Sequence, residues 1–243
     1  MTTELRIDRQ FRGPTGSGNG GWTAGTLAEH LRSATGHDGP VEVTLRQPPP
    51  LDTALTIESD ATTARLLGPV RLVAEAVVAE PSALGDPVEP VDAVAARAAE
   101  ADYAGLRHHP YPQCFTCGPD RTAGDGLLIF PGLIAPGRTA CTWTPHPAMA
   151  AEDGRLGPEY VWAALDCPGG WTEDLDGRPV VLGRMTAQVF SRPLADRVHV
   201  AVGRQLDVDG RKTRTATTVY DASGRMIGQA AQVWIAVDPA TFA

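Results

Sequence analysis

The sequence predicts an α+β fold in which one helix-wrapped antiparallel sheet occurs twice, so that a single chain forms a pseudo-dimer. The first observation is that each half has one helix-sized apolar stretch followed by a run of alternating strands. The second is that both runs break at a Pro-Leu corner, at Pro50-Leu51 and at Pro193-Leu194. Alternation at every second residue indicates half-buried strands, and proline in sheets is confined to edges and bends. A functional site is therefore expected where the two halves meet.

The alternating strand ahead of each corner has the same pattern in both halves. Its apolar residues lie on one face: Val41, Val43 and Leu45 in the first half, and Met185, Ala187 and Val189 in the second. The strand after the corner continues with Leu55 and Ile57, or with Val198 and Val200. The two segments align when the first carries one extra residue in its Pro48-Pro49-Pro50 corner. This alignment predicts a structural repeat.

The first half begins with a predicted strand over residues 4–11 and a glycine-rich turn over 13–21. A helix is predicted to begin near Trp22 and to end at Gly36, a residue that commonly terminates helices. One face of this helix carries apolar residues at helical spacing: Ala24, Leu27, Ala28 and Leu31. Four strands are predicted to follow, near residues 41–47, 53–60, 63–67 and 70–79.

A linker is predicted between the halves. Residues 80–90 are rich in proline and polar residues, and the alanine-rich stretch over 93–104 predicts a surface helix. The predicted organisation is an N-terminal half over 1–80, a linker with this helix over 81–107, and a C-terminal half over 108–243.

The second half contains a helix that is predicted to be buried. Pro158 suits the first position of a helix, and residues 160–165 are apolar on every side. Asp166 ends the apolar run, and Pro168-Gly169-Gly170 is predicted to end the helix. Strands are predicted near residues 127–134, 138–144, 180–191, 196–207, 211–221 and 225–237. Asp209-Gly210 and Ser223-Gly224 are typical of hairpin turns.

Composition excludes several classes of protein. The chain has 243 residues, 42% hydrophobic content and a net charge of -8, and these values are ordinary for a globular protein. An acidic chain lacks the basic footprint of a nucleic-acid-binding protein. No basic start followed by an apolar stretch opens the sequence, and no run approaches the about 18–20 apolar residues of a membrane span. We expect a cytoplasmic protein without nucleic-acid or membrane partners.

Four short segments resemble the TesB-like acyl-CoA thioesterases, whose fold is a double hotdog. These are Asn19-Gly20-Gly21-Trp22 at the start of the first helix, residues 161–166 in the second helix, residues 190–193 at a strand end, and residues 226–232 in the last strand. The segment over 114–121, together with residues 164–170, resembles a narrower actinobacterial group of thioesterase-like proteins. The resemblance implies a double hotdog fold and activity on acyl thioesters.

The resemblance also implies roles for individual residues. Asp166 corresponds to the catalytic aspartate and Gln232 to the catalytic glutamine of the family, with Asp166 as base and Gln232 holding the water. Oxyanion stabilisation and substrate binding fall to the remaining matched positions: Asn19, Gly20, Gly21, Trp22, Gly183 and Arg192. The sequence departs from the family at Gly183, where the family has a hydroxyl residue. For Asp166 and Gln232 the alternatives are a helix cap and a solvent-facing strand residue.

The cysteines carry a second set of hypotheses. Cys114 and Cys117 form one Cys-x-x-Cys, which is half of a zinc site. Candidates for the other half are His108, His109, Cys141 and His146. The alternative is a turn with free thiols, so we expect no cofactor, with zinc left open. Cys167 could be a nucleophile or a small buried hydrophobic residue.

The sequence therefore favours an acyl-thioester hydrolase whose partner is acyl-CoA or an acyl-carrier protein. The basic run over residues 210–214 could meet the phosphates of coenzyme A, or it could be a solvated hairpin. One alternative is a non-catalytic acyl-thioester or lipid-binding protein, which the Gly183 departure favours. Another is a hydratase or dehydratase, although neither helix presents the histidine typical of that chemistry. A homodimer of pseudo-dimers is compatible with the fold.

Overall fold

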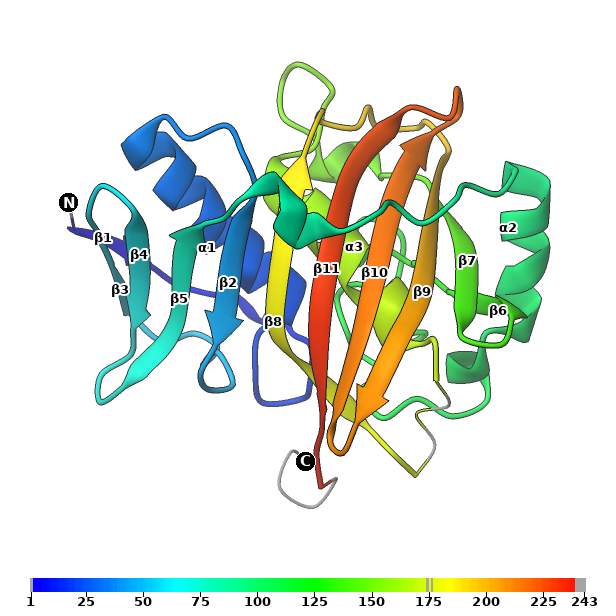
Figure 1. The fold of residues 1–243 in the computed structure, drawn as a ribbon, viewed down its shortest axis with the longest axis horizontal. Helices are drawn as coiled ribbons and strands as arrows, with labels where there is room; N and C mark the ends of the chain where they lie inside the picture. The colour runs from blue at the N-terminus through cyan, green and yellow to red at the C-terminus, as the bar shows by residue number, and fades with distance from the viewer. Residues whose placement is uncertain (1, 174, 176, 239–243) are drawn as a thin grey trace.

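The computed structural model describes residues 2–173, 175 and 177–238, and one antiparallel sheet of 11 strands dominates it (Figure 1). The strands are β1 (Thr2–Leu5), β2 (Val41–Leu45), β3 (Leu55–Ser59), β4 (Thr63–Leu67), β5 (Leu72–Val78), β6 (Gly132–Ala135), β7 (Arg138–Trp143), β8 (Val180–Val189), β9 (His199–Asp209), β10 (Lys212–Asp221) and β11 (Met226–Ala236). The helices are α1 (Gly20–Thr35), α2 (Ala93–Ala99) and α3 (Pro158–Gly170). Short 3-10 turns span Arg9–Phe11, Pro81–Leu84, Glu100–Asp102, Ala104–Leu106 and Pro147–Met149.

The strand order confirms the predicted repeat. The sheet reads β1-β3-β4-β5-β2-β8-β11-β10-β9-β7-β6, so the order outward from β2 matches the order outward from β8, with β6 added at one edge. At the seam Val41 stands opposite Ala187 and Val43 opposite Met185. In the alignment of the two halves, Val41 corresponds to Met185 and Val43 to Ala187. Rotation of one half onto the other therefore converts the pair Val41–Ala187 into the pair Met185–Val43. A local twofold axis therefore passes between β2 and β8.

Helices α1 and α3 lie side by side on one face of the sheet and bury the main hydrophobic core against it (Figure 1). They run antiparallel, because Gly21 of α1 contacts Ala163 and Asp166, whereas Gly25 contacts Glu159 and Trp162. A Cβ atom built on Gly25 would lie 2.6 Å from the Cβ atom of Trp162. Glycine is thus required at both positions by the close approach of the two helices.

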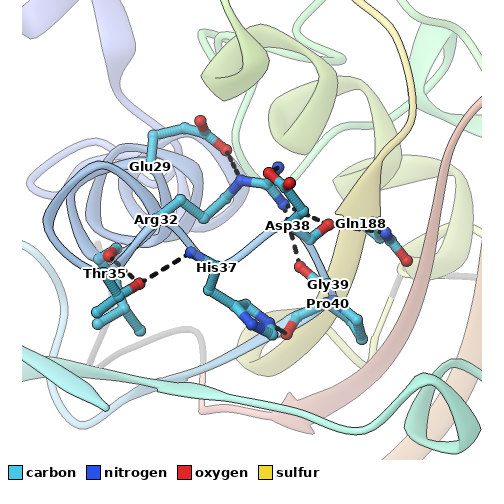
Figure 2. Close-up of polar contacts among 9 residues, drawn as sticks. Glu29, Arg32, Thr35, His37, Asp38, Gly39, Pro40 and Gln188 are labelled. Atoms are coloured by element: carbon cyan, nitrogen blue, oxygen red, sulfur yellow. Dashed lines mark hydrogen bonds and ion pairs between the residues drawn. The ribbon is translucent and has the colours of Figure 1, made fainter. Parts of the chain in front are cut away.

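Polar contacts fix the loop that joins α1 to β2 (Figure 2). Arg32 on the last turn of α1 donates to the carbonyl oxygens of Asp38 at 3.2 Å and of Gly39 at 3.0 Å, and it lies 3.5 Å from the Glu29 carboxylate. Gln188 of β8 donates to the same Asp38 carbonyl at 3.0 Å. A residue of β8, in the second half, therefore helps to hold the loop that leads from α1 into β2.

The linker crosses the sheet face opposite to α1 and α3 before it reaches α2 (Figure 1). The N–H group of Val88 donates to Thr218 Oγ1 at 3.0 Å, and its carbonyl accepts from the Tyr220 hydroxyl at 2.6 Å. Gln229 Nε2 donates to the carbonyl oxygen of Gly85 at 3.0 Å. Val88 also packs in a second, smaller cluster of buried apolar residues on this face. The linker is therefore bound to the sheet along its path.

Several predicted boundaries were wrong for local reasons. Residues 9–11 form a turn that stacks Phe11 on Trp22 with ring centroids 4.1 Å apart, so β1 ends at Leu5. The alanine-rich helix ends at Ala99 and continues as 3-10 turns. Residues 127–131 form no strand, because the N–H groups of Leu127 and Ile129 donate to the segment over 115–116.

The second-half helix ends within the predicted segment, at Gly170. Asp166 and Pro168 lie inside α3, which continues to Gly170. Proline removes one intrahelical donor, but in the last turn of a helix this loss is tolerated when another group supplies the hydrogen bonds. Among the described residues, none of the helices has both the length and the apolar composition that a membrane crossing requires. The division of the chain at residues 80 and 107 stays a prediction.

Gly25→Ala tests the close approach of the helices. A Gly-to-Ala change inside a helix ordinarily stabilises it by about 1 kcal/mol. Here the added methyl group meets Trp162 and Glu159, so we expect a loss of about 1–3 kcal/mol in the free energy of unfolding, measured by urea denaturation. Ser33→Ala on the exposed face of α1 is the control and should change it by less than about 0.5 kcal/mol. A Gly25→Ala protein as stable as the wild type would contradict the packing argument.

Candidate active site at the seam of the two halves

A cavity of about 340 Å³ opens where the halves meet. The first half contributes the glycine-rich turn before α1 and the loop after β2, and the second contributes Asp166, Cys167 and the first residues of β8. Cys114 and Cys117 complete one wall. The volume lies at the lower end of the range of small-molecule sites, and the lining combines apolar surface with a few convergent polar groups. The cavity lies where the two halves meet, the place at which the sequence predicts a functional site.

Asp166 is held at the cavity by the other half of the chain. Its side chain is 3% exposed, and Oδ2 accepts hydrogen bonds from the Gly21 N–H at 3.0 Å and from Asn19 Nδ2 at 3.1 Å. Its second oxygen, Oδ1, has no hydrogen-bond partner among the residues that the structure describes. One carboxylate oxygen is therefore fixed by two donors, while the other is buried without a hydrogen-bond partner.

The start of α1 explains why the two donors converge on Asp166. Asn19 caps the helix, because its Oδ1 accepts from the Trp22 N–H at 2.8 Å, and this bond turns Nδ2 toward Asp166. Gly21 lacks a Cβ atom, which would lie 2.6 Å from that of Asp166, so its N–H can reach the carboxylate. The Gly20 N–H, at the first position of α1, has no hydrogen-bond partner in the described part of the chain, and Gly20 lines the cavity.

The surroundings of Asp166 make its carboxyl group a weak acid. Burial raises its pKa to about 7, and the nearby Cys114 sulfur adds to the rise, while the donors Gly21 and Asn19 act in the opposite direction. A carboxyl group with a pKa near neutrality can exchange a proton under ordinary conditions.

Gln232 lies behind α3 and does not line the cavity. Its Nε2 donates to the carbonyl oxygens of Leu165 at 2.7 Å and Asp166 at 3.0 Å. Its Oε1 accepts from the hydroxyl groups of Thr215 at 2.8 Å and Thr217 at 2.9 Å. All four hydrogen-bonding positions of the amide are used by the protein. Gln232 thus fastens the backbone of α3 to β10 and β11.

The remaining predicted residues are not all brought together. Gly183 lines the cavity, and a Cβ atom there would meet Ile235 at 2.8 Å. Trp22 is buried against Phe11 and is absent from the cavity lining. Arg192 lies elsewhere, in an ion pair with Asp153 at 2.7 Å, beside a different hollow on the loop after β8.

Three cysteines meet at the wall of the cavity beside Asp166. The Sγ atoms of Cys114, Cys117 and Cys167 all lie within 4.8 Å of one another, and those of Cys114 and Cys167 are 3.9 Å apart. His109 Nε2 lies 3.3 Å from Cys117 Sγ. Sequence reasoning treated Cys167 separately from the Cys-x-x-Cys. No spacing in the sequence indicated this meeting, because the two segments are 50 residues apart (Cys117 to Cys167).

The other metal-site candidates lie outside this cluster. Cys141 is buried in β7, where its thiol lies 3.9 Å from the Ala201 carbonyl oxygen. His146 Nδ1 accepts from the Ala148 N–H at 3.2 Å and caps a 3-10 turn. Hydrogen bonds from Cys117 and Cys167 lower the pKa of the Cys114 thiol, whereas burial raises that of Cys167. Within the cluster, Cys114 is therefore the thiol most easily ionised.

Comparison with solved structures identifies the fold as the double hotdog. The chain resembles the tesB protein MAP1729c of Mycobacterium avium subs paratuberculosis, at a TM-score of 0.61 and 12% identity over 98% of this chain and 93% of that one. A hot dog fold protein of unknown function from Alicyclobacillus acidocaldarius matches at 0.55 and 13%, over 98% and 94%. The dehydratase domain of PpsC from Mycobacterium tuberculosis, in complex with C12:1-CoA, matches at 0.62 and 17%, over 97% and 93%.

At these identities the likeness concerns the fold alone. Comparison with protein-family models and with curated proteins gave no match.

Asp166→Asn should stabilise the protein at neutral and alkaline pH. Because burial raises the folded-state pKa to about 7, the unfolded chain releases this proton at lower pH, and the free energy of unfolding falls between about pH 4 and pH 7. Asparagine at this position removes the loss, so the free energy of unfolding should rise by at most about 4 kcal/mol. Urea denaturation at pH 5 and pH 8 should show a larger gain at pH 8.

The exposed Asp153 provides a control of opposite sign. Hydrogen bonds from the Arg155 N–H and from Arg192 lower its pKa, so Asp153→Asn should not stabilise the protein at pH 8. Equal effects of the two substitutions would contradict the burial argument for Asp166.

Gln232→Leu should destabilise the protein strongly. It leaves two backbone carbonyls and two threonine hydroxyls without their partner, and each buried unsatisfied group costs about 1–3 kcal/mol. We expect a loss of more than about 2 kcal/mol in the free energy of unfolding. The control is Gln188→Leu, which removes one half-exposed hydrogen bond and should cost less than about 1 kcal/mol. Equal losses would show that Gln232 does not anchor α3.

Proposed function

We propose that the protein hydrolyses an acyl thioester in the seam cavity, with Asp166 as the base. The observation that carries the proposal is the asymmetry of this carboxylate in a residue that lines a cavity: the other half holds Oδ2 by two donors, while Oδ1 is buried and unpartnered. A purely structural carboxylate is ordinarily satisfied at both oxygens. The likeness to a tesB protein and to a dehydratase domain holding an acyl-CoA supports the choice of substrate class.

The proposed reaction needs one proton carrier and one oxyanion donor. Asp166 takes a proton from a water molecule through Oδ1, and the oxygen of that water attacks the carbonyl carbon of the thioester. The resulting oxyanion would accept from the Gly20 N–H, at the positive end of α1. When the carbon–sulfur bond breaks, Asp166 returns the proton to the leaving thiolate. The products are a carboxylic acid and a free thiol.

The other predicted residues take supporting roles in this proposal. Asn19 and Gly21 position the base, and Gln232 holds the α3 backbone that carries it, instead of holding the water. Gly183 lines the same cavity but provides no hydroxyl group, where the resembling family has one. Trp22 and Arg192 have no direct contact with the reacting groups in this scheme.

Two arginines favour coenzyme A as the carrier. Arg46 of the loop after β2 and Arg211 of the turn between β9 and β10 both line the seam cavity. Guanidinium groups are well suited to phosphate, so the phosphates of coenzyme A would lie between them. This proposal uses one residue of the basic run over 210–214 for which the sequence suggested the same role.

Non-catalytic binding of an acyl thioester is the second candidate. It is favoured by the bonding of Gln232, which leaves no free amide to orient a water molecule, and by the absence of a hydroxyl group at Gly183. Both candidates place an acyl thioester in the same cavity. They differ only in whether the thioester bond is broken.

An acyl-CoA panel tests the proposal. Wild-type protein should release free thiol, and Asp166→Asn should lower kcat/KM by about 100-fold or more, since a general base contributes about 10²–10⁴. The variant should still bind acyl-CoA, as measured by calorimetry, and the surface variant Asp153→Asn should keep full activity. An active Asp166→Asn protein would refute Asp166 as the base. Binding without thiol release by the wild type would instead establish the second candidate.

A further inference from the structure

We propose that Cys114, Cys117 and Cys167 bind one zinc ion at the wall of the seam cavity. Three thiols from two separate parts of the chain converge there, each of them buried, with all Sγ atoms within 4.8 Å of one another. A disulfide would use only two of the three. This inference does not depend on the proposed hydrolysis.

The spacing of the sulfur atoms suits a tetrahedral thiolate site. Zinc–sulfur bonds are about 2.3 Å long, so two thiolates at a tetrahedral angle lie about 3.8 Å apart. The Sγ atoms of Cys114 and Cys167 are 3.9 Å apart. Only small side-chain rotations are needed to bring the third sulfur to the same separation. Thiolate is also the ligand that selects zinc among the abundant divalent cations.

The backbone around the cysteines is built to hold them in place. The Gly118 N–H donates to the Cys114 carbonyl oxygen at 2.9 Å and closes the Cys-x-x-Cys turn. A Cβ atom on Gly118 would lie 2.5 Å from the Pro112 carbonyl oxygen, so only glycine fits there. Thr116 Oγ1 donates to the Ala163 carbonyl oxygen at 3.0 Å and ties the turn to α3, which carries Cys167. The cluster is therefore fixed before any ion binds.

Nitrogen donors surround the sulfur atoms, as they do around metal-bound thiolates. Trp171 Nε1 lies 3.5 Å from Cys117 Sγ, and Asn19 Nδ2 lies 3.7 Å from Cys114 Sγ. His109 Nδ1 accepts from the Tyr111 N–H at 2.8 Å, so Nε2 keeps its proton and donates to Cys117. In this arrangement His109 supports a ligand instead of serving as the fourth one.

The fourth coordination position would face the cavity. Cys114, Cys117 and Cys167 all line it, so a water molecule or a group of a bound ligand can complete the tetrahedron. Metal binding releases the protons of the thiols, and the bound zinc balances the charge of the resulting thiolates, which the neutral side-chain donors Trp171 and Asn19 could not do.

Metal content and cobalt substitution test the proposal. Untagged protein purified under reducing conditions without chelator should contain about one zinc per chain. Replacement by Co²⁺ should give the thiolate-to-cobalt charge-transfer and visible bands of a tetrahedral site. Each of the variants Cys114→Ser, Cys117→Ser and Cys167→Ser should lose the bound metal. Cys141→Ser, which changes a buried thiol outside the cluster, should keep it, and His109→Asn should keep the stoichiometry with weaker binding.

Thermal unfolding of wild-type protein tests the proposal even if the cluster variants fail to fold. Because an ion that binds only the native state stabilises it, a chelator should lower the Tm of wild-type protein and of Cys141→Ser by the same amount, and added zinc should restore it. Wild-type protein that takes up neither zinc nor cobalt, and whose Tm is unaffected by chelator, would overturn the proposal. So would loss of the metal in Cys141→Ser to the same extent as in the cluster variants.

Discussion

The closest contact between α1 and α3 is the constraint on which the rest of the structure depends. Gly21 allows the two helices to approach until a backbone N–H of the first half reaches a carboxylate of the second. The same approach buries Asp166, raises its pKa and leaves Oδ1 without a hydrogen-bond partner. Any side chain at this position would separate the helices, and with them Asp166 and its donors. The absence of a side chain at Gly21 therefore determines both the distance between the helices and the hydrogen bonding of Asp166.

The two halves have the same fold, but the hollows beside their equivalent loops differ. The loop after β2 lines the seam cavity, and the equivalent loop after β8 lines a smaller hollow of about 180 Å³ at the opposite end of the helix pair. There Arg192 is held by Asp153 and by the carbonyl oxygen of Leu156. The second helix begins at Gly157-Pro158, without the side-chain cap that Asn19 provides to the first. The two related ends therefore differ in the volume of the hollow, in the residues that line it and in the cap of the helix beside it.

Local patterns in the sequence predicted the repeat and the burial of the helix that carries Asp166, because the spacing of apolar residues follows the period of each element. The pairing of β2 with β8, with Val41 opposite Ala187, was not predicted, since alternation within a strand does not identify the neighbouring strand. The bonding of Gln232 and the meeting of Cys167 with the Cys-x-x-Cys were not predicted, since both depend on segments far apart in the chain. The spacing of apolar residues indicates which face of a helix or strand is buried, but it does not identify the segment that packs against this face.

The pairing of β2 with β8 has a consequence for how the chain unfolds. One sheet runs without interruption through both halves, and the linker is fastened across its outer face. Separation of the halves would break backbone hydrogen bonds at the seam and expose the α1–α3 contact and the core beneath it to water. Neither half can therefore melt while the other stays native, and the two form one cooperative unit. The buried carboxylate of Asp166 and its two donors come together only when both halves are folded, so a partly folded species lacks this arrangement.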